Sequence, residues 1–298
     1  MSRSLDSIRR GIRSGADAAR WACVMEATAP KVGNVHPGQS FCDLSYTDFI
    51  VAAWIAADKL QCANTDTPFS CLVLQTIQET RLQTRSNVNL GILLLIGPLA
   101  QVVRQHSVGS RIDWLTEVPR LLARQTHQDA LNIFESIRIS SAGGLGEVDT
   151  MDVHNDPGDN RSETELDLIE AMDTAAGRDA IARQYSSGFS DFFNRVVPIV
   201  HQAIEKQSDI LMGIATAHIE LLRSEPDTLI ARKCGLEVAC EVQRRARQLD
   251  TLSPEAVDEF DQFLRSDKNR LNPGTTADLI AAALFVLFID PRYETRTS

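Results

Sequence analysis

The sequence predicts an all-α fold, built as one multi-helix globular domain over residues 1–298. Apolar side chains recur three or four positions apart through most of the chain, which is the spacing of one face of a helix. The strict alternation of apolar and polar residues that marks a half-buried strand is scarce. A length of 298 residues with 43% hydrophobic content suffices for a full core, and neither a Ser/Pro/Gly linker nor a run of charges divides the chain.

The N-terminal half contains five segments with helical spacing: 5–28, 47–60, 72–82, 89–103 and 114–137. In the first, Ile8, Ile12 and Ala16 lie four residues apart and fall on one face. The fourth is almost wholly apolar, which indicates a buried central helix. Pro119 predicts a break in the last, because proline removes a backbone donor.

The C-terminal half shows the same spacing in four segments: 163–172, 188–204, 208–222 and 235–249. Ser253 followed by Pro254 is typical of a helix start, and that helix is expected to end at Leu264. Another helix is expected to begin at Pro273 and to run through Ile289. Between the two halves, residues 139–162 are expected to form a long irregular loop rich in Gly and acidic residues, in which a short hairpin stays open.

Composition excludes several classes of protein. The net charge is -10 and no basic stripe occurs, which argues against nucleic-acid binding. No run of about 18 uncharged apolar residues is present, so no membrane-spanning helix is expected. The N-terminal residues lack the apolar core of a secretory signal, and we expect a cytoplasmic protein. The six cysteines form no CxxC pair and are interpreted as buried thiols. A homodimer stays open, because helix 89–103 suits either a core or an interface.

The first candidate site is the Pro/Gly-rich loop within residues 26–38. It places Lys31, Asn34 and His36 within six residues, and polar side chains held on such loops are often functional. Lys31 can neutralise a phosphate, Asn34 can hydrogen-bond, and His36 can donate, accept or bind metal. A solvated lysine and a structural histidine are the alternatives. Glu26 precedes the loop at a helix end, where the helix dipole disfavours an acid, and this predicts a partner for it.

The second candidate site pairs Asn87 and Asn89 just before the apolar helix. Gly91 follows, and its missing side chain allows a ligand to approach the backbone at a helix N-terminus, which attracts anions. Simple capping of the helix by either asparagine is the alternative.

The third candidate site follows three glycines between residues 143 and 146. Four carboxylates fall within ten residues: Glu147, Asp149, Asp152 and Asp156. Their oxygens suit a divalent metal, and Mg²⁺ that bridges to phosphates is the usual case. The spacing does not match a calcium EF-hand. A disordered acidic loop is the alternative.

Two further candidate segments lie near the C-terminus. Asp227 and Thr228 are placed to cap a short helix, and Arg232 and Lys233 then put two cations beside Gly235, where they suit a phosphate or form plain surface charge. Residues 272–278 place Gly and Thr at the start of the last helix, again an end that attracts anions.

Taken together, the five segments resemble the triphosphoribosyl-dephospho-CoA synthase family over residues 15–290. The matching pieces are Glu26 with Pro30-Lys31-x-Gly33-Asn34-Val35, Asn87-x-Asn89-x-Gly91, the segment Gly143 to Glu147, Asp227-Thr228 with Arg232 and Gly235, and Pro273-Gly274-x-x-Ala277-Asp278-Leu279. The chain departs from the lyase-associated members, which carry His-Lys where it has Leu90-Gly91 and His-Arg-Gly-Gly where it has Arg232-Lys-Cys-Gly. These departures indicate a divergent branch.

The resemblance implies an all-α transferase that uses ATP and a dephospho-CoA-like acceptor. The 2′-hydroxyl of 3′-dephospho-CoA attacks ribose C1 of ATP, adenine leaves, and the triphosphate stays on the ribose. Cleavage builds positive charge on the ribose, which a carboxylate stabilises. The implied catalytic residues are Glu147 and Asp149, and the implied Mg²⁺ ligands are Asp149 and Asp152. The implied nucleotide- and phosphate-binding residues are Lys31, Asn34, His36, Asn87, Asn89, Arg232, Lys233 and Asp278.

Three other functions stay open at this point. The divergent motifs allow a related ribosyl-transfer step in the biosynthesis of a methanopterin-type one-carbon cofactor. A helical protein that binds a nucleotide without turnover is the second, and a Mg²⁺-dependent hydrolase of N-ribosyl bonds is the third.

Overall fold

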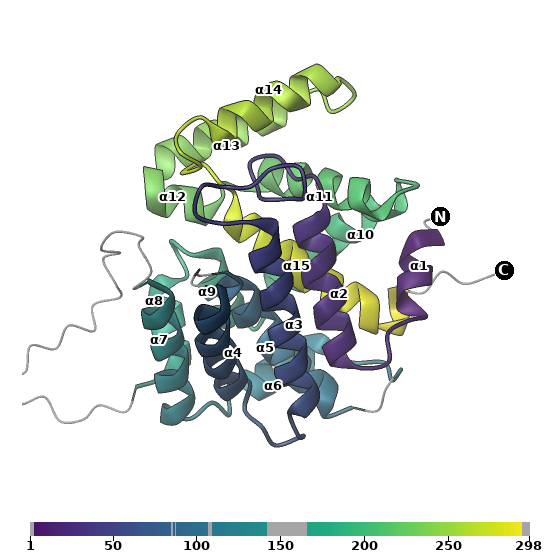
Figure 1. The fold of residues 1–298 in the computed structure, drawn as a ribbon. Coiled ribbons are helices and arrows are strands. Elements are labelled where there is room, and N and C mark those ends of the chain that lie inside the picture. The colour runs from purple at the N-terminus through teal and green to yellow at the C-terminus, as the bar shows by residue number, and fades with distance from the viewer. Residues whose placement is uncertain (1–2, 85, 87, 107–108, 142–165, 294–298) are drawn as a thin grey trace, which may run out of the picture.

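The computed structural model describes residues 3–84, 86, 88–106, 109–141 and 166–293. The all-α prediction is confirmed, because these residues form fifteen α-helices and no β-strand (Figure 1). In order, the helices are α1 (Arg3–Arg9), α2 (Gly15–Thr28), α3 (Tyr46–Cys62), α4 (Phe69–Thr84), α5 (Leu90–Arg104), α6 (Trp114–Leu122), α7 (His127–Ser141), α8 (Leu168–Ala175), α9 (Ala180–Ser186), α10 (Val197–Glu205), α11 (Ile210–Ser224), α12 (Thr228–Cys234), α13 (Leu236–Gln248), α14 (Pro254–Arg265) and α15 (Gly274–Ile289).

Helix α15 is the centre of the larger hydrophobic cluster. From Leu279 to Phe288 its residues are buried on every side, as expected of a helix that is apolar all round. It packs against α2, α5, α10 and α11. The helices α2, α3, α4 and α7 stand side by side in Figure 1, each in contact with the next.

Helix α5 is also buried, from Ile92 through Val102. The apolar segment 89–103 therefore belongs to the core of the chain rather than to an exposed interface. None of the helices in the described part of the chain combines the length and apolar character needed to span a bilayer.

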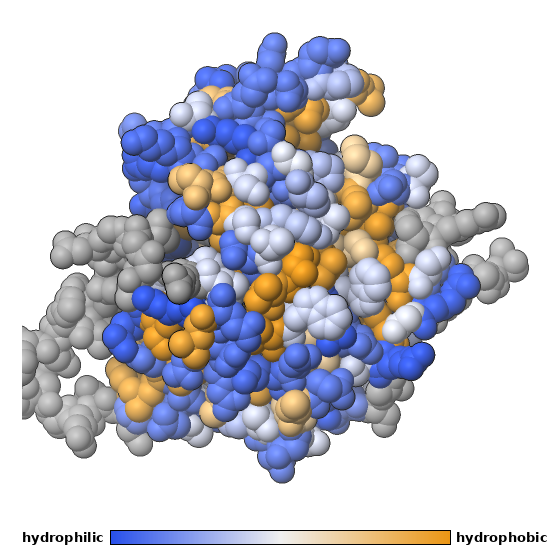
Figure 2. Space-filling model, viewed as in Figure 1, coloured by the Kyte–Doolittle hydropathy of each residue, from blue (hydrophilic) through white to orange (hydrophobic). Residues whose placement is uncertain are grey.

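A smaller hydrophobic cluster lies under the α13–α14 hairpin at the top of Figure 1. Its buried members come from α11 to α14, and Leu271 and Val32 complete it. Figure 2 shows that the outer surface of this hairpin is largely hydrophilic. The loop after α2 joins the two clusters, because Ala29 is buried in the larger one and Val32 in the smaller one. One protein segment thus connects both cores.

Several helix boundaries differ from the sequence prediction. The segment 5–28 is two helices rather than one, because Ser14 caps α2 by accepting a hydrogen bond from Asp17 N–H at 3.1 Å. Pro119 lies inside α6 rather than at its end. Proline has no N–H to donate to the carbonyl of Leu115, but Leu115 is an exposed residue, so the helix continues through Pro119. The break comes later, at Ala123–Thr126, and α9 was not predicted.

The predicted start of the irregular loop, residue 139, is too early, because α7 extends to Ser141. Residues 142–165 lie outside the described residues, so the rest of that loop and the hairpin within it stay predictions, as does the single domain. All six cysteines are free thiols. Burial was predicted correctly for Cys23 and wrongly for Cys42, Cys62 and Cys240, which are exposed.

Candidate functional site

Glu26 and Lys31 form a buried ion pair between the end of α2 and the loop that follows it. Lys31 Nζ lies 2.9 Å from Glu26 Oε1, and the two side chains are 0% and 4% exposed. Lys31 Nζ also donates to the backbone carbonyl of Glu26. The ammonium therefore neutralises an acid that the dipole of α2 disfavours, so the predicted partner of Glu26 exists and is Lys31. An ammonium has three N–H donors, which leaves Lys31 one for a ligand. Its role in phosphate binding stays a prediction.

The loop turns sharply after Lys31. Gly33 has a φ of 72°, in the left-handed region that glycine adopts most readily. Asn34 is buried, and its Oδ1 has no hydrogen-bond partner. His36 and Gln39 then pair through both of their backbone groups. The loop therefore holds a buried amide oxygen that is free to bind a ligand.

His36 is held in its neutral form. Partial burial, together with the positive charges of Arg265 and Lys31, lowers the pKa of His36, and Asp261 opposes that effect. Its Nδ1 accepts the Gly38 N–H at 3.2 Å. In the neutral ring the proton then lies on Nε2, so His36 presents a hydrogen-bond donor.

Asn89 begins α5 with an unused buried amide. Its φ of 70° is left-handed, and its side chain caps nothing, so the simple capping alternative is wrong for this residue. Asn89 is 7% exposed, and neither Oδ1 nor Nδ2 has a hydrogen-bond partner. A buried unpaired amide costs about 1–3 kcal/mol, so such a group calls for a bound partner. Asn87 lies outside the described residues.

Asp278, in the first turns of α15, lies against Gly91 at the start of α5. A methyl group on Gly91 would stand 2.0 Å from Asp278 Oδ2, so the carboxylate occupies the space that Gly91 leaves free. Burial and the nearby carboxylates of Glu26, Asp227 and Asp179 raise the pKa of Asp278 well above its usual value, although Arg232 opposes them. Among the described residues no group donates a hydrogen bond to it. These surroundings favour a protonated Asp278.

Asp227 ties two helices of the site together. Its Oδ1 accepts the N–H groups of Leu229 and Ile230, which confirms the predicted cap of α12. Its Oδ2 accepts the N–H and the hydroxyl of Thr276, both at 2.7 Å, at the start of α15. Asp227 is 3% exposed and fully engaged, so its role is structural.

The cations of α12 lie at its last turn. Arg232 Nη1 is 3.4 Å from Asp179 Oδ2, and Asp179 caps α9. Burial and the positive charge of Arg232 lower the pKa of Lys233. Both cations therefore stand near the acids around Asp278, and their role with phosphate stays a prediction.

The predicted acidic site cannot be placed. Glu147, Asp149 and Asp152 lie outside the described residues. In the ranges that the structure describes, no group of three His, Cys, Asp or Glu side chains is arranged to hold a metal ion. The Mg²⁺ site therefore stays a prediction.

A family model described as CitG, ATP:dephospho-CoA triphosphoribosyl transferase, matches residues 12–297. The chain belongs to this family. It is a transferase of the triphosphoribosyl-dephospho-CoA synthase type, and the family's reaction is triphosphoribosyl transfer to dephospho-CoA. No curated protein matches the chain significantly.

A crystal structure from Archaeoglobus fulgidus, described as a proposed triphosphoribosyl-dephospho-CoA synthase, is similar to this transferase in fold. The TM-score is 0.63 at 22% identity, and the match covers 81% of this chain and 99% of that one. The likeness at this identity supports the all-α architecture.

Sequence reasoning missed three parts of this candidate site. His218 on α11 is fully buried, and burial together with the charge of Lys31 lowers its pKa to about 3. Asp179 caps a short helix that was not predicted. Asp261 and Arg265 on α14 reach the loop from about 230 positions away. A lone histidine on an amphipathic helix and an ordinary i,i+4 ion pair carry no sequence signal of function.

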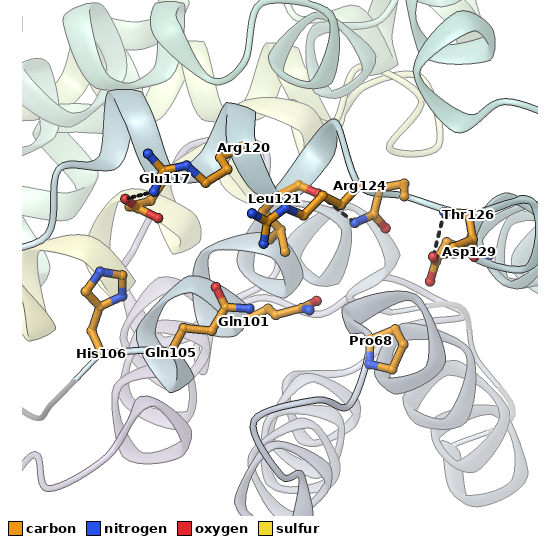
Figure 3. A pocket seen from close by; sticks show the side chains of 11 residues that line it. Pro68, Gln101, Gln105, His106, Glu117, Arg120, Leu121, Arg124, Thr126 and Asp129 are labelled. Carbon is orange, nitrogen blue, oxygen red and sulfur yellow. Dashed lines mark hydrogen bonds and ion pairs between the residues drawn. The ribbon is translucent and has the colours of Figure 1, made fainter.

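A separate pocket of about 530 Å³ opens near the other end of α5. Figure 3 shows side chains of α6 facing those at the end of α5 across it. Its acids are already engaged, since Glu117 pairs with Arg120 at 2.6 Å and Asp129 accepts two hydrogen bonds from Thr126. It lies about 20 Å along α5 from Gly91, at a rise of about 1.5 Å per residue. We therefore do not assign the transfer reaction to it.

Proposed function

We propose that this transferase breaks the bond between ribose C1 and adenine in ATP and passes the triphosphoribosyl group to the 2′-hydroxyl of 3′-dephospho-CoA. Adenine leaves, and the triphosphate stays on the transferred ribose. The observation that carries the proposal is the polar cluster at the start of α5, where the buried Asn89 amide has no partner and the half-buried Asp278 carboxylate lies against Gly91, in a chain that the CitG-family model matches over residues 12–297. Buried polar groups without partners are what a polar substrate would satisfy.

Asp278 is the acid of this cluster best suited to assist the departing adenine. Glu26 is neutralised by Lys31 and Asp227 is engaged by two helices, whereas Asp278 has no donor among the described residues. A neutral carboxylic acid can donate its proton to a ring nitrogen of adenine as the C1–N bond breaks. The amides of Asn34 and Asn89 would orient the nucleotide through their unused groups.

The acceptor side of the reaction needs a base. The 2′-hydroxyl forms the new bond to ribose C1, and its proton passes to a carboxylate, for which we propose Glu147 or Asp149. The other would stabilise the positive charge on the ribose. We propose Mg²⁺ as a further requirement, with Asp149 and Asp152 as ligands, and derive no step through it.

The triphosphate requires donors and positive charge. Arg232 and Lys233 supply two cations at the last turn of α12, and the N-terminus of α5 adds the partial positive charge of a helix start. Lys31 and His36 would each add one N–H group. We place this reaction in the cytoplasm, as the composition predicts.

The test is release of adenine from ATP, measured by chromatography with purified protein and Mg²⁺, with and without 3′-dephospho-CoA. We expect release that depends on the acceptor, together with a product whose mass equals acceptor plus triphosphoribosyl group. Release without any acceptor would identify a hydrolase instead. Bound ATP with no release in either reaction would contradict the proposed transfer.

A further inference from the structure

One face of α14 packs against the Gly33–Asn34 turn of the loop that follows α2, which is called the substrate loop below. Asp261, Leu264 and Arg265 are three and four positions apart, so they share a helix face. Leu264 is fully buried there, and a side chain on Gly33 would meet its Cβ at 2.8 Å and its Cδ1 at 2.9 Å. The turn and the helix are thus in direct contact.

Asp261 and Arg265 hydrogen-bond to the first N–H and the last carbonyl of the Gly33–Asn34 dipeptide. Asp261 Oδ1 accepts the Gly33 N–H at 2.7 Å, and Arg265 Nη2 donates to the Asn34 carbonyl at 2.7 Å. The two side chains are joined to each other, with Arg265 Nε 2.7 Å from Asp261 Oδ2. These bonds lead from the Gly33 N–H through Asp261 and Arg265 to the Asn34 carbonyl, so the two side chains form a closed clip around the turn.

The clip is more shielded from solvent than an ordinary surface ion pair. The side chains of Arg265 and Asp261 are 15% and 19% exposed. The guanidinium uses two different N–H groups at once, one for the carboxylate and one for the carbonyl, which the point charge of a lysine cannot reproduce. The turn that it holds carries the unpaired Oδ1 of Asn34 and leads directly to His36.

We propose that Asp261 and Arg265 are positioning residues, which hold the Gly33–Asn34 turn so that Asn34 and His36 meet the nucleotide. This inference rests on the proposed function and assigns a role to the α13–α14 hairpin, whose outer surface is largely hydrophilic (Figure 2). The hairpin acts on the substrate loop without touching the reacting atoms.

A matched pair for comparison lies on the same hairpin. Glu241 and Arg245 on α13 are also four residues apart, with Arg245 Nε 2.8 Å from Glu241 Oε1. Arg245 stacks on Phe263, as Arg265 lies over Phe41. Neither Glu241 nor Arg245 has a hydrogen bond to the loop within the described structure.

The experiment compares Arg265→Lys with Arg245→Lys in the full chain. ATP binding is measured by titration calorimetry, adenine release gives kcat and KM for ATP, and thermal melts report stability. For Arg265→Lys we expect about tenfold weaker ATP binding and a raised KM with kcat changed much less, because a charged hydrogen bond to the turn is lost while the charge is kept. Arg245→Lys should match the wild type.

A second variant, Asp261→Asn, keeps an acceptor for the Gly33 N–H and should fall between Arg265→Lys and the wild type. The proposal is overturned if Arg265→Lys binds and turns over ATP as the wild type does, or if it lowers only the melting temperature. If the wild-type protein binds ATP without releasing adenine, the proposed function is contradicted but the role of the clip is not. ATP binding by Arg265→Lys, compared with the wild type, would still decide that role.

Discussion

Replacing Lys31 by methionine tests whether the site is built on a buried ion pair. The two charges are 2.9 Å apart with almost no exposure. At an effective dielectric constant of about 20, their attraction is about 6 kcal/mol. Desolvation offsets part of it, and loss of one partner from a buried pair costs about 3–5 kcal/mol, because the other charge is left uncompensated.

The loss translates into a measurable change in melting temperature. At about 2.1 cal/mol/K per residue, the unfolding entropy of the chain is about 0.6 kcal/mol/K, so a loss of about 4 kcal/mol lowers Tm by about 6 °C. Scanning calorimetry at pH 7 should show this shift for Lys31→Met and a similar one for Glu26→Gln. The double variant should recover most of the loss, since neutral side chains can replace a buried pair at little cost.

The control is Arg138→Met, which breaks an exposed pair with Glu135 of 2.6 Å and should shift Tm far less. If Lys31→Met instead melted with the wild type and only raised KM for ATP, the reasoning would be refuted. Lys31 would then bind the phosphate as a free cation and would not stabilise the folded protein.

Three further predictions concern the acids around α15. Gly91→Ala should abolish most turnover while the helices remain folded by circular dichroism, because the new methyl group displaces the Asp278 carboxylate, which would lie 2.0 Å away; unchanged kcat would contradict this. Asp278→Asn should lose activity yet melt higher than the wild type at pH 7. A raised pKa in the folded state means that wild-type stability falls as pH rises above the unfolded value of about 3.9, so the advantage should vanish in melts at about pH 3.5. Asp227→Ala should lower the unfolding free energy by about 3 kcal/mol in urea titrations, since a cap and a charged bond to Thr276 are both lost; a loss below about 1 kcal/mol would contradict the structural role.

The helices could be predicted because their signals are local. Spacing of three or four residues identified most of them, and Ser253 before Pro254 marked the start of α14, which the structure confirms. The helix boundaries that were predicted wrongly depend on local features that the spacing of apolar residues does not reveal. α1 ends at Arg9 and Ser14 caps α2, and the seven residues of α9 are too few to show a period.

Parts of the candidate site were also visible in the sequence. The loop holding Lys31, Asn34 and His36 and the segment ending in Asp278 were singled out, and the structure brings charges from both to Glu26. A partner for Glu26 was predicted from the helix dipole, although the residue was not. The family match over residues 12–297 confirms the resemblance that these segments carried.

The sequence by itself determined the helical fold class, most helices and the loops that carry polar groups, because short spacings encode periodicity, caps and turns. Only the tertiary structure decided which groups meet. Asp261 binds Gly33 across 228 positions, Asp278 fills the space beside Gly91, and His218 is buried near Lys31. Such contacts depend on how whole helices pack, and the same pairs of residue types occur in other proteins without contact. The identities of the residues alone therefore do not predict these contacts.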